Sequence, residues 1–202
     1  MDHYFSDKPS SEHSIREIEV FFASHNFRFL TDSGVFSKGS LDKGTRLLLE
    51  SIPPLCDEKV LDLGCGWGAI GVIISGMYPQ SRVYMTDINP RAVALSKKNA
   101  KRNNVSVTVQ SSDSFTMVDE NFDIILTNPP IRAGKKVVYK MVDDSYHHLT
   151  DGGRFYAVVR TKQGANSYRD KLDEVFGSSE IVKRGSGYKV FKAIKDEGNK
   201  GS

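Results

Sequence analysis

The chain has 202 residues, of which 39% are hydrophobic and 26% are charged, and its formal net charge is +3. Such a chain can bury a sufficient core in one domain without a disulfide framework or a structural metal, and its two cysteines, Cys56 and Cys65, fit a reducing, cytoplasmic location. No apolar run approaches the roughly 20 residues that span a bilayer, and the polar N-terminus contains no signal region. These two features exclude the membrane-spanning and secreted classes of protein. The mildly basic net charge permits contact with nucleic acid.

The N-terminal part of the chain predicts two strands and a helix. Residues 17–23 and 26–31 are β-prone, and the apolar spacing at residues 41–51 predicts a helix that a Pro-Pro pair ends. The sequence pattern changes at Lys59. The expected division is an N-terminal extension at 1–58, a domain at 59–195 and a flexible tail at 196–202.

From Lys59 onward, short apolar strands alternate with amphipathic helices. Strands are expected at residues 59–63, 82–86, 105–110, 122–127, 154–159, 179–184 and 188–194. Helices are expected at residues 69–77, 90–103, 135–149 and 166–176, with Asp151-Gly-Gly153 closing the third of them. This alternation predicts an α/β fold: a Rossmann-like, doubly wound, mostly parallel seven-stranded sheet with a C-terminal antiparallel hairpin that adds an antiparallel strand at one edge. Ligands of such sheets bind beyond the carboxyl ends of the strands.

The first strand of this series runs into a glycine-rich loop with the sequence VLDLGCGWGAIG at residues 60–71. Asp87 ends the next strand, 19 positions after Gly68, where a carboxylate can accept hydrogen bonds from ribose hydroxyls. Residues 66–71 also satisfy the dinucleotide pattern G-x-G-x-x-G, so a nicotinamide or flavin cofactor is an alternative. Asp62 disfavours it, because a carboxylate at the mouth of the loop repels a pyrophosphate but suits a ligand with an ammonium group. The sequence therefore favours S-adenosyl-L-methionine.

Three blocks in order, LDLGCGWGAIG, TDINPRAV and SSDSF, resemble motifs I, II and III of class I S-adenosylmethionine-dependent methyltransferases. The resemblance covers nearly the whole chain from Lys59. It implies that the loop from Gly64 to Gly68 holds the methionine portion and the ribose, that Asp62 lies near the methionine amino group, that Asp87 binds the ribose hydroxyls, and that Ile88 and Asp113 contact the adenine. The alternative for Asp87 and Asp113 is that they only cap strand ends. The cofactor-binding residues expected in this way are Asp62, Gly64, Cys65, Gly66, Gly68, Asp87, Ile88, Asp113 and Asn128.

The strand at 122–127 ends in Asn128-Pro129-Pro130, a stiff loop at the carboxyl edge. The Asn128 side-chain oxygen and the Pro129 carbonyl can act as paired acceptors for the N–H bonds of an exocyclic amine, which favours its pyramidal, nucleophilic form. A simple turn is the alternative. After the three blocks above, the sequence resembles motif IV of the amino-methyltransferases, which implies that Asn128, Pro129 and Pro130 are catalytic. Neither cysteine lies near this loop, which argues against methylation at cytosine C5.

Ile131 follows the second proline, where many enzymes with this motif carry an aromatic residue. This difference weakens the hypothesis that the substrate is adenine N6 or a protein glutamine. The segment NPPIRAGK from Asn128, the blocks GVFS, LDKGT and LLL before Lys59, and VVRTKQG after the fifth strand resemble the 16S ribosomal RNA guanine-N2 methyltransferase family. In that family the N-terminal blocks cover the cofactor. The resemblance implies N2-methylguanine in 16S ribosomal RNA as the product. The better-known members carry an extra N-terminal half that this chain lacks, so a homodimer or the small ribosomal subunit itself is the expected guide to the substrate.

Basic residues lie near the expected active edge. Arg132, Lys135 and Lys136 can neutralise phosphates beside the target base and are the expected RNA-binding residues, whereas Lys140 fits a solvated helix face. A second cluster, KKNAKR at residues 97–102, is an alternative contact for RNA. His147-His148 is interpreted as a helix end, so no metal site is expected. A cofactor-bound RNA-binding or assembly module without turnover is the remaining alternative, although it would not need the paired acceptors at Asn128.

Overall fold

The computed structural model describes residues 15–32 and 40–196, so the GVFS block at residues 34–37 and the tail beyond residue 196 lie outside the described residues. The strands are β1 (Arg16–Phe22), β2 (His25–Thr31), β3 (Lys59–Leu63), β4 (Arg82–Asp87), β5 (Val107–Ser111), β6 (Phe122–Thr127), β7 (Leu149–Arg160), β8 (Ser179–Gly185) and β9 (Tyr188–Ile194). The helices are α1 (Lys43–Leu49), α2 (Ala69–Met77), α3 (Pro90–Arg102), the 3-10 turn η1 (Ile131–Ala133), α4 (Lys135–His147) and α5 (Ala165–Phe176). No helix in the described ranges has both the length and the apolar character needed to cross a membrane.

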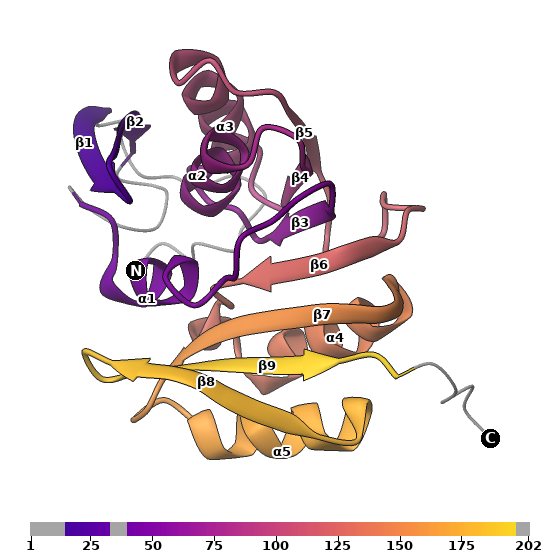
Figure 1. Cartoon of the computed structure of the whole chain (residues 1–202). Helices are drawn as coiled ribbons and strands as arrows, with labels where there is room; N and C mark the ends of the chain where they lie inside the picture. The colour runs from indigo at the N-terminus through magenta and orange to yellow at the C-terminus, as the bar shows by residue number, and fades with distance from the viewer. Residues whose placement is uncertain (1–14, 33–39, 197–202) are drawn as a thin grey trace.

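A seven-stranded sheet with the order β5-β4-β3-β6-β7-β9-β8 forms the centre of the molecule (Figure 1). Neighbouring strands from β5 to β7 are parallel, which confirms the predicted Rossmann-like, mostly parallel sheet. β9 runs antiparallel to both β7 and β8. The antiparallel strand thus lies one place in from the edge and not at the edge as expected. The reason is burial: β9 carries Val190 and Phe191, both fully buried, whereas side chains of β8 alternate between half-buried and exposed.

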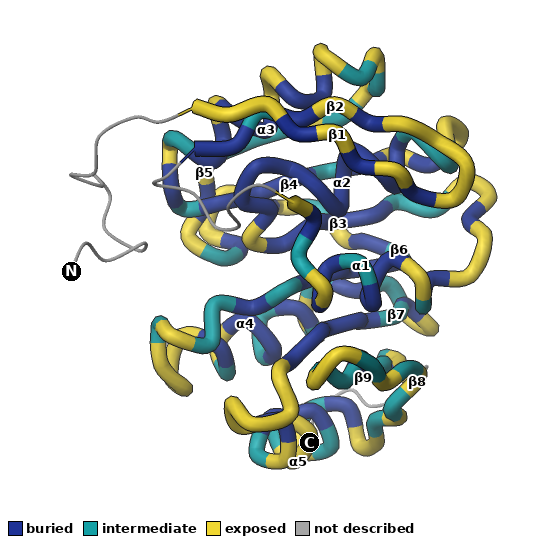
Figure 2. The backbone as a smooth tube through the Cα atoms, turned by 90° about the vertical axis from the view of Figure 1, so that its left-hand side faces the viewer, coloured by how far each residue is buried: buried dark blue, intermediate teal, exposed yellow. Residues whose placement is uncertain are grey.

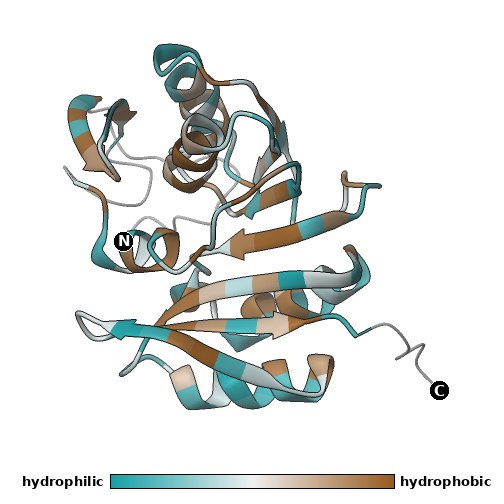
Figure 3. Ribbon diagram, viewed as in Figure 1, coloured by the Kyte–Doolittle hydropathy of each residue, from teal (hydrophilic) through white to brown (hydrophobic). Residues whose placement is uncertain are grey.

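Side chains that alternate along the central strands build a core on each face of the sheet. On one face, Val60 and Ile124 pack with apolar residues of α1, α2 and α3. On the other face, Leu61 and Ile125 pack with those of α4 and α5. Figure 3 shows hydrophobic residues along β6 and on α1 and α2, and Figure 2 shows that most of the central strands are buried while exposed residues gather on the loops and outer helix faces. The central strands are therefore covered on both sides, whereas side chains of β4 and β5 such as Tyr84 and Gln110 line an open pocket on one face.

β1 and β2 form a separate antiparallel hairpin that packs beside α3 (Figure 1). Asn99 of α3 accepts a hydrogen bond from the Leu30 N–H (2.7 Å) and donates to the Leu30 carbonyl (2.9 Å). Asn103, one turn later, makes the same pair of bonds with Arg28 (2.8 and 2.7 Å). Because residues four apart lie on one helix face, the two amides pair with β2 as a neighbouring strand would.

The boundary between α4 and β7 differs from the expectation. α4 ends at His147 and β7 begins at Leu149, so Asp151-Gly-Gly153 lies inside a strand and does not close a helix. The Gly152 N–H donates to the Lys195 carbonyl (2.7 Å), and the register with β6 shifts at this point. Gly152 has a φ of +73°. A glycine at such an irregularity can remain within a strand, which a reading of Gly-Gly as a terminator misses.

Candidate active site

Loops at the carboxyl ends of four parallel strands carry the candidate residues. β3 runs into the loop from Gly64 to Gly68, β4 ends at Asp87, β5 leads to Asp113, and β6 leads to Asn128. β3 lies between β4 and β6, and the helices that follow β3 and β6 pack on opposite faces of the sheet. A crevice at such a reversal is where ligands bind in doubly wound folds.

The glycine-rich loop is bent tightly over the end of β4. The N–H groups of Gly64 and Cys65 both donate to the Thr86 carbonyl at 2.9 Å, and the Gly66 N–H donates to Asp87 Oδ2 at 2.8 Å. The Cys65 side chain is buried, and this burial raises the pKa of its thiol. The thiol is therefore protonated, and its Sγ lies 3.4 Å from Ser96 Oγ.

Helix α3 supports the same loop from behind. Ser96 Oγ donates to the Gly66 carbonyl (2.8 Å), and Asn99 Nδ2 donates to the Trp67 carbonyl (2.7 Å). Gly68 has a φ of +84°, and a Cβ there would lie 3.1 Å from Ser96 Cβ. Glycine at position 68 thus permits the loop to approach α3, in addition to any approach to a ligand.

The Asp87 carboxylate is held rigidly at the end of β4. Its Oδ2 accepts from the Gly66 N–H and its Oδ1 accepts from the Asn89 N–H, each at 2.8 Å. Burial raises the pKa of Asp87, and these two backbone bonds oppose the rise. A carboxylate offers about four acceptor positions, so this geometry leaves room for two ribose hydroxyls. Ile88, the next residue, is half-buried beside it.

Asp62 lies beneath the loop and is fully buried. Its Oδ2 accepts from the Gly71 N–H at 2.9 Å, whereas its Oδ1 finds no partner among the described residues. Burial raises the pKa of Asp62 to about 7, and the nearby charge of Asp87 adds to the rise. An orphaned buried carboxylate oxygen is unfavourable unless a donor satisfies it. The ammonium group of a methionine moiety is such a donor, so the free acceptor at Asp62 suits the expected cofactor.

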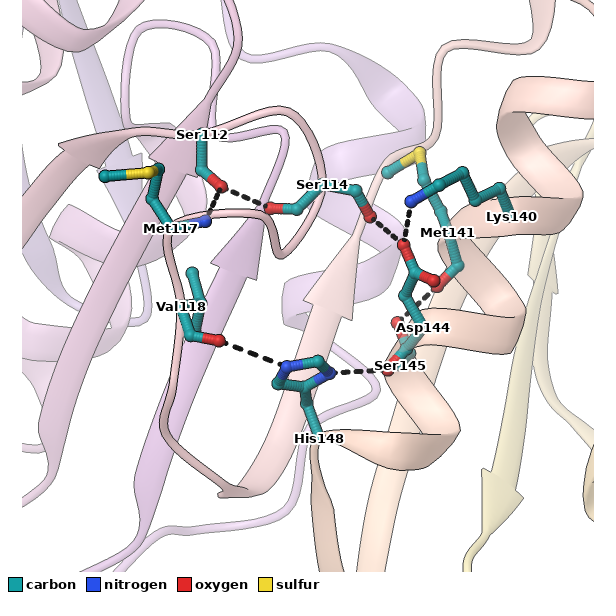
Figure 4. A network of polar contacts seen from close by, with 9 residues as sticks. All are labelled: Ser112, Ser114, Met117, Val118, Lys140, Met141, Asp144, Ser145 and His148. Atoms are coloured by element: carbon teal, nitrogen blue, oxygen red, sulfur yellow. Dashed lines mark hydrogen bonds and ion pairs between the residues drawn. The ribbon is translucent and has the colours of Figure 1, made fainter.

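The loop after β5 carries Asp113, which is exposed, and α4 holds this loop in place (Figure 4). Ser114 Oγ donates to Asp144 Oδ2 at 2.9 Å, and His148 Nε2 lies 3.1 Å from the Val118 carbonyl oxygen. His148 is the C-terminal cap of α4. Within the described ranges, no group of three or more His, Cys, Asp or Glu residues is arranged to hold a metal ion.

Asn128 is oriented by contacts from the N-terminal extension. Its Nδ2 donates to Asp42 Oδ2 and to Thr45 Oγ1, both at 3.0 Å, and no described residue donates to its Oδ1. The Pro129 carbonyl accepts from the Ile131 N–H at 2.9 Å and keeps one lone pair. Two acceptors therefore remain available after β6, as an amine substrate requires.

The basic residues fall into two groups. Arg132 in η1 and Lys135 and Lys136 in the first turn of α4 are exposed, and none of them forms an ion pair with another described residue. By contrast, Lys140 pairs with Asp144, and Arg102 of the second cluster pairs with Glu17. The first group is free to meet phosphates, and so are three exposed lysines of the second cluster, Lys97, Lys98 and Lys101, whereas Lys140 and Arg102 have structural partners.

Three residues have supporting roles that the motifs do not indicate: Asp42, which lies in the block LDKGT, and Ser96 and Asn99. Asp42 carries a signal, since an aspartate before an apolar helical run predicts an N-cap. Ser96 and Asn99 are polar residues on the otherwise apolar buried face of α3. That buried polar position is the signal that could have indicated a hydrogen-bonding role.

The chain is similar to known methyltransferases over most of its length. The sequence model of the methyltransferase small domain matches residues 26–192. The uncharacterized protein YbxB of Bacillus subtilis is 41% identical over 198 residues, covering 96% of this chain and 98% of that protein. Ribosomal RNA small subunit methyltransferase C of Mannheimia succiniciproducens is 37% identical over 165 residues, covering 80% of this chain and 49% of that enzyme.

Among solved structures, the chain resembles the T. thermophilus 16S rRNA N2 G1207 methyltransferase (RsmC) in complex with AdoMet and guanosine. The TM-score is 0.82 at 28% identity, covering 90% of this chain and 50% of that one. The chain thus spans about half the length of the ribosomal RNA methyltransferases that it matches, and nearly the full length of the Bacillus relative.

Proposed function

Since this chain belongs to the methyltransferase small domain family, a family of class I S-adenosylmethionine-dependent methyltransferases, we propose that it methylates an exocyclic amine, and specifically N2 of a guanine in 16S ribosomal RNA. The observation that carries the proposal is the orientation of Asn128. Its two N–H bonds are engaged by Asp42 and Thr45, so its oxygen is the atom left to accept from a substrate.

The chemistry expected of the site is alignment and polarisation. S-adenosylmethionine, when bound, supplies a methyl group on a sulfonium centre. Asp62 and Asp87 would hold its amino group and its ribose hydroxyls. Asn128 Oδ1 and the Pro129 carbonyl would accept the N–H bonds of the amine, which localises the nitrogen lone pair toward the methyl carbon. The residues of the chain then act by positioning. As the nitrogen takes the methyl group, the sulfur–methyl bond would break and the nitrogen would give up one proton to solvent, because the sequence after β6 offers no strong general base.

Contact with RNA is proposed for Arg132, Lys135 and Lys136. They are exposed beside Asn128, on η1 and the start of α4, where phosphates next to a target base would lie. Such contacts position the RNA without reading its sequence. Selection of the nucleotide would then come from the shape of the small ribosomal subunit or from a second copy of the chain, and we expect the protein to act in the cytoplasm.

The proposal is tested by transfer of labelled methyl from S-adenosylmethionine to small ribosomal subunits from a strain lacking this chain, followed by digestion to nucleosides. Label in N2-methylguanosine is the expected result. Label in another methylated nucleoside would retain amine methylation but replace the target. An absence of label, together with measurable cofactor binding, would overturn the ribosomal substrate and favour a protein glutamine or a module without turnover.

A further inference from the structure

The N-terminus of α1 contacts the loop after β6 through side chains that the established family assignment leaves unexplained. We propose that Asp42 and Thr45 are positioning residues, which fix the Asn128 amide so that its oxygen, and not its nitrogen, is presented to the target amine. The inference rests on the proposed amine methylation and adds a role for the N-terminal extension in it. It assigns no ligand to α1 itself.

The contacts form a closed triangle of hydrogen bonds. Thr45 Oγ1 donates to Asp42 Oδ2 at 2.6 Å, which uses the only hydrogen of the hydroxyl. The lone pairs of Thr45 Oγ1 are then free to accept from Asn128 Nδ2 (3.0 Å), and Asp42 Oδ2 accepts the second Asn128 N–H (3.0 Å). Both N–H bonds of the amide are thereby engaged by acceptors.

The polarity of the triangle determines which way the amide faces. An ionised carboxylate only accepts hydrogen bonds, so a flipped Asn128 would place its oxygen against the oxygen of Asp42. That arrangement would replace an attraction by a repulsion at a half-buried position. Without Asp42 and Thr45, the two orientations of the amide would differ little in free energy, and only one of them can accept from an amine.

Asp42 is itself held from two sides. Its Oδ1 accepts from the Gly44 N–H (2.9 Å) and its Oδ2 from the Thr45 N–H (2.9 Å), which is the geometry of a helix N-cap. The Tyr188 hydroxyl donates to Asp42 Oδ1 (3.3 Å) and accepts from Arg160 Nε (2.8 Å). α1 thus connects the ends of β6, β7 and the start of β9.

Close packing keeps α1 in this register. A Cβ at Gly44 would lie 2.8 Å from the ring of Tyr188, so only glycine permits the two to approach. The buried Leu48 and the neighbouring leucines of α1 pack into the same core as Val158 and Val190 of β7 and β9. The triangle is therefore carried by a rigid element, as a positioning role requires.

The first test compares Thr45→Val with Thr45→Ser. Valine keeps the shape of threonine but removes the hydroxyl, whereas serine keeps the hydroxyl. We expect Thr45→Val to lower kcat for methyl transfer to the ribosomal subunit about tenfold, with the KM for S-adenosylmethionine unchanged, and Thr45→Ser to restore most of the rate. Thr150→Val, which removes a hydroxyl bonded to Asp123 at the other end of the sheet, is the matched control and should leave kcat unchanged.

A second readout does not depend on turnover. The two side-chain amide protons of Asn128, assigned by their disappearance in Asn128→Asp, should shift in the NMR spectrum of Thr45→Val and stay in place in Thr45→Ser. Asp42→Asn provides an independent variant if Thr45→Val does not fold. Asparagine caps a helix as well as aspartate does, but it has one oxygen where two are needed, so kcat should fall here too.

Equal kcat values for Thr45→Val and the wild type, or an unmoved Asn128 resonance, would overturn the positioning role. The positioning role would also be overturned if the decrease in kcat paralleled the decrease in melting temperature in every variant, because that result would indicate a purely structural role. If the wild type itself transfers no methyl to the subunit, the proposed substrate fails, and the NMR comparison still decides whether Thr45 orients Asn128.

Discussion

Two carboxylates beneath the glycine-rich loop are buried in different ways. Asp87 has a backbone donor on each oxygen, from Gly66 and Asn89. Asp62 has one donor, Gly71, and its second oxygen is without a partner among the described residues. Because desolvation favours the neutral form of a carboxyl group, the pKa of Asp62 rises from its ordinary value of 3.8 to about 7. A cation placed at Oδ1 would reverse that rise, so ligand binding and ionisation of Asp62 should be coupled.

Cofactor affinity should therefore depend on pH through Asp62. Below about pH 7 the free protein binds a proton at this carboxyl group, and an ammonium-bearing ligand must displace it. We expect the Kd of S-adenosylmethionine, measured by calorimetry, to rise about tenfold for each pH unit below 7. Asp62→Asn should bind weakly and show no such dependence between about pH 5.5 and 7. If the wild-type Kd does not change with pH over this range, Asp62 does not bind the amino group of the cofactor.

The same shift has a consequence for stability in the absence of ligand. A carboxyl group whose pKa is raised by folding favours the folded state while it is protonated. The contribution of Asp62 to the free energy of unfolding is thus present below about pH 4 and lost as the pH rises through about 7. Saturating cofactor should remove this loss.

Asn128 should be needed for turnover but not for cofactor binding. Asn128→Ala removes the acceptor that we propose for the substrate amine, and preorganised polar groups of this kind contribute about a hundredfold or more to kcat. We expect that loss in methyl transfer to the ribosomal subunit, with the Kd of S-adenosylmethionine changed less than about threefold, by the loss of a peripheral contact. Asn121→Ala, at the other end of the same strand, is the control. An equal loss of affinity and rate would mean that Asn128 serves mainly the cofactor.

At the residue scale, the sequence predicts those site residues that stand directly after a strand. Asp87 and Asn128 follow apolar runs, and parallel strands bring their carboxyl ends together. Asp42 and Tyr188 are 146 positions apart, and no local pattern indicates that β9 contacts the residue of the extension that binds Asn128. Such contacts depend on how the finished elements pack, which periodicity does not encode.

At the scale of elements, the junction of α3 with the hairpin supports the glycine-rich loop. Asn99 is fully buried and bonds to Leu30 on one side and to the Trp67 carbonyl on the other. Asn103 is half-buried and makes a similar pair of bonds with Arg28, and these bonds are exposed to solvent. The two asparagines thus share a geometry and differ in burial, which makes them a matched pair.

Asn99→Ala should destabilise the protein by about 3 kcal/mol, because it leaves buried backbone groups without partners. Asn103→Ala should cost only about 1 kcal/mol, since water can replace its bonds. Urea unfolding gives both values, and Asn99→Ala alone should also weaken cofactor binding through the loop at Trp67. Equal losses for the two variants would show that burial of Asn99 does not set its contribution.

Most elements are predictable because helices cover both faces of the central strands, so these strands are apolar runs and the helices are amphipathic. Two features are not predictable in this way. Gly152 and Gly153 belong to an irregular part of β7 whose partners, β6 and Lys195, lie elsewhere in the chain. β9 lies between β7 and the edge strand β8 because Phe191 is buried there, and this burial becomes evident only once β7 and β8 are both in place.

At the scale of the whole molecule, the extension and the sheet share one core. Val60 and Ile124 of the sheet lie in the same cluster as the apolar residues of the hairpin and α1. The described residues before position 59 that are buried in this cluster are Ile18, Val20, Phe22, Phe27, Phe29, Leu41, Leu47, Leu48, Leu49, Ile52 and Leu55. The boundary between an extension and a domain at residue 58 remains a prediction from the sequence. The shared core indicates that the two parts fold together.

A chain that begins at Lys59 should therefore fail to fold cooperatively. Burial of one large apolar side chain stabilises a protein by about 1.5–3 kcal/mol, so the loss of all these side chains exceeds a typical total stability of about 5–15 kcal/mol. We expect the full chain to melt in one transition, seen at the same temperature by far- and near-ultraviolet circular dichroism, and residues 59–202 to show no sharp transition. A truncated chain that melts sharply near the temperature of the full chain would show that the sheet with its remaining helices is a complete domain, and that the extension is an attachment to it.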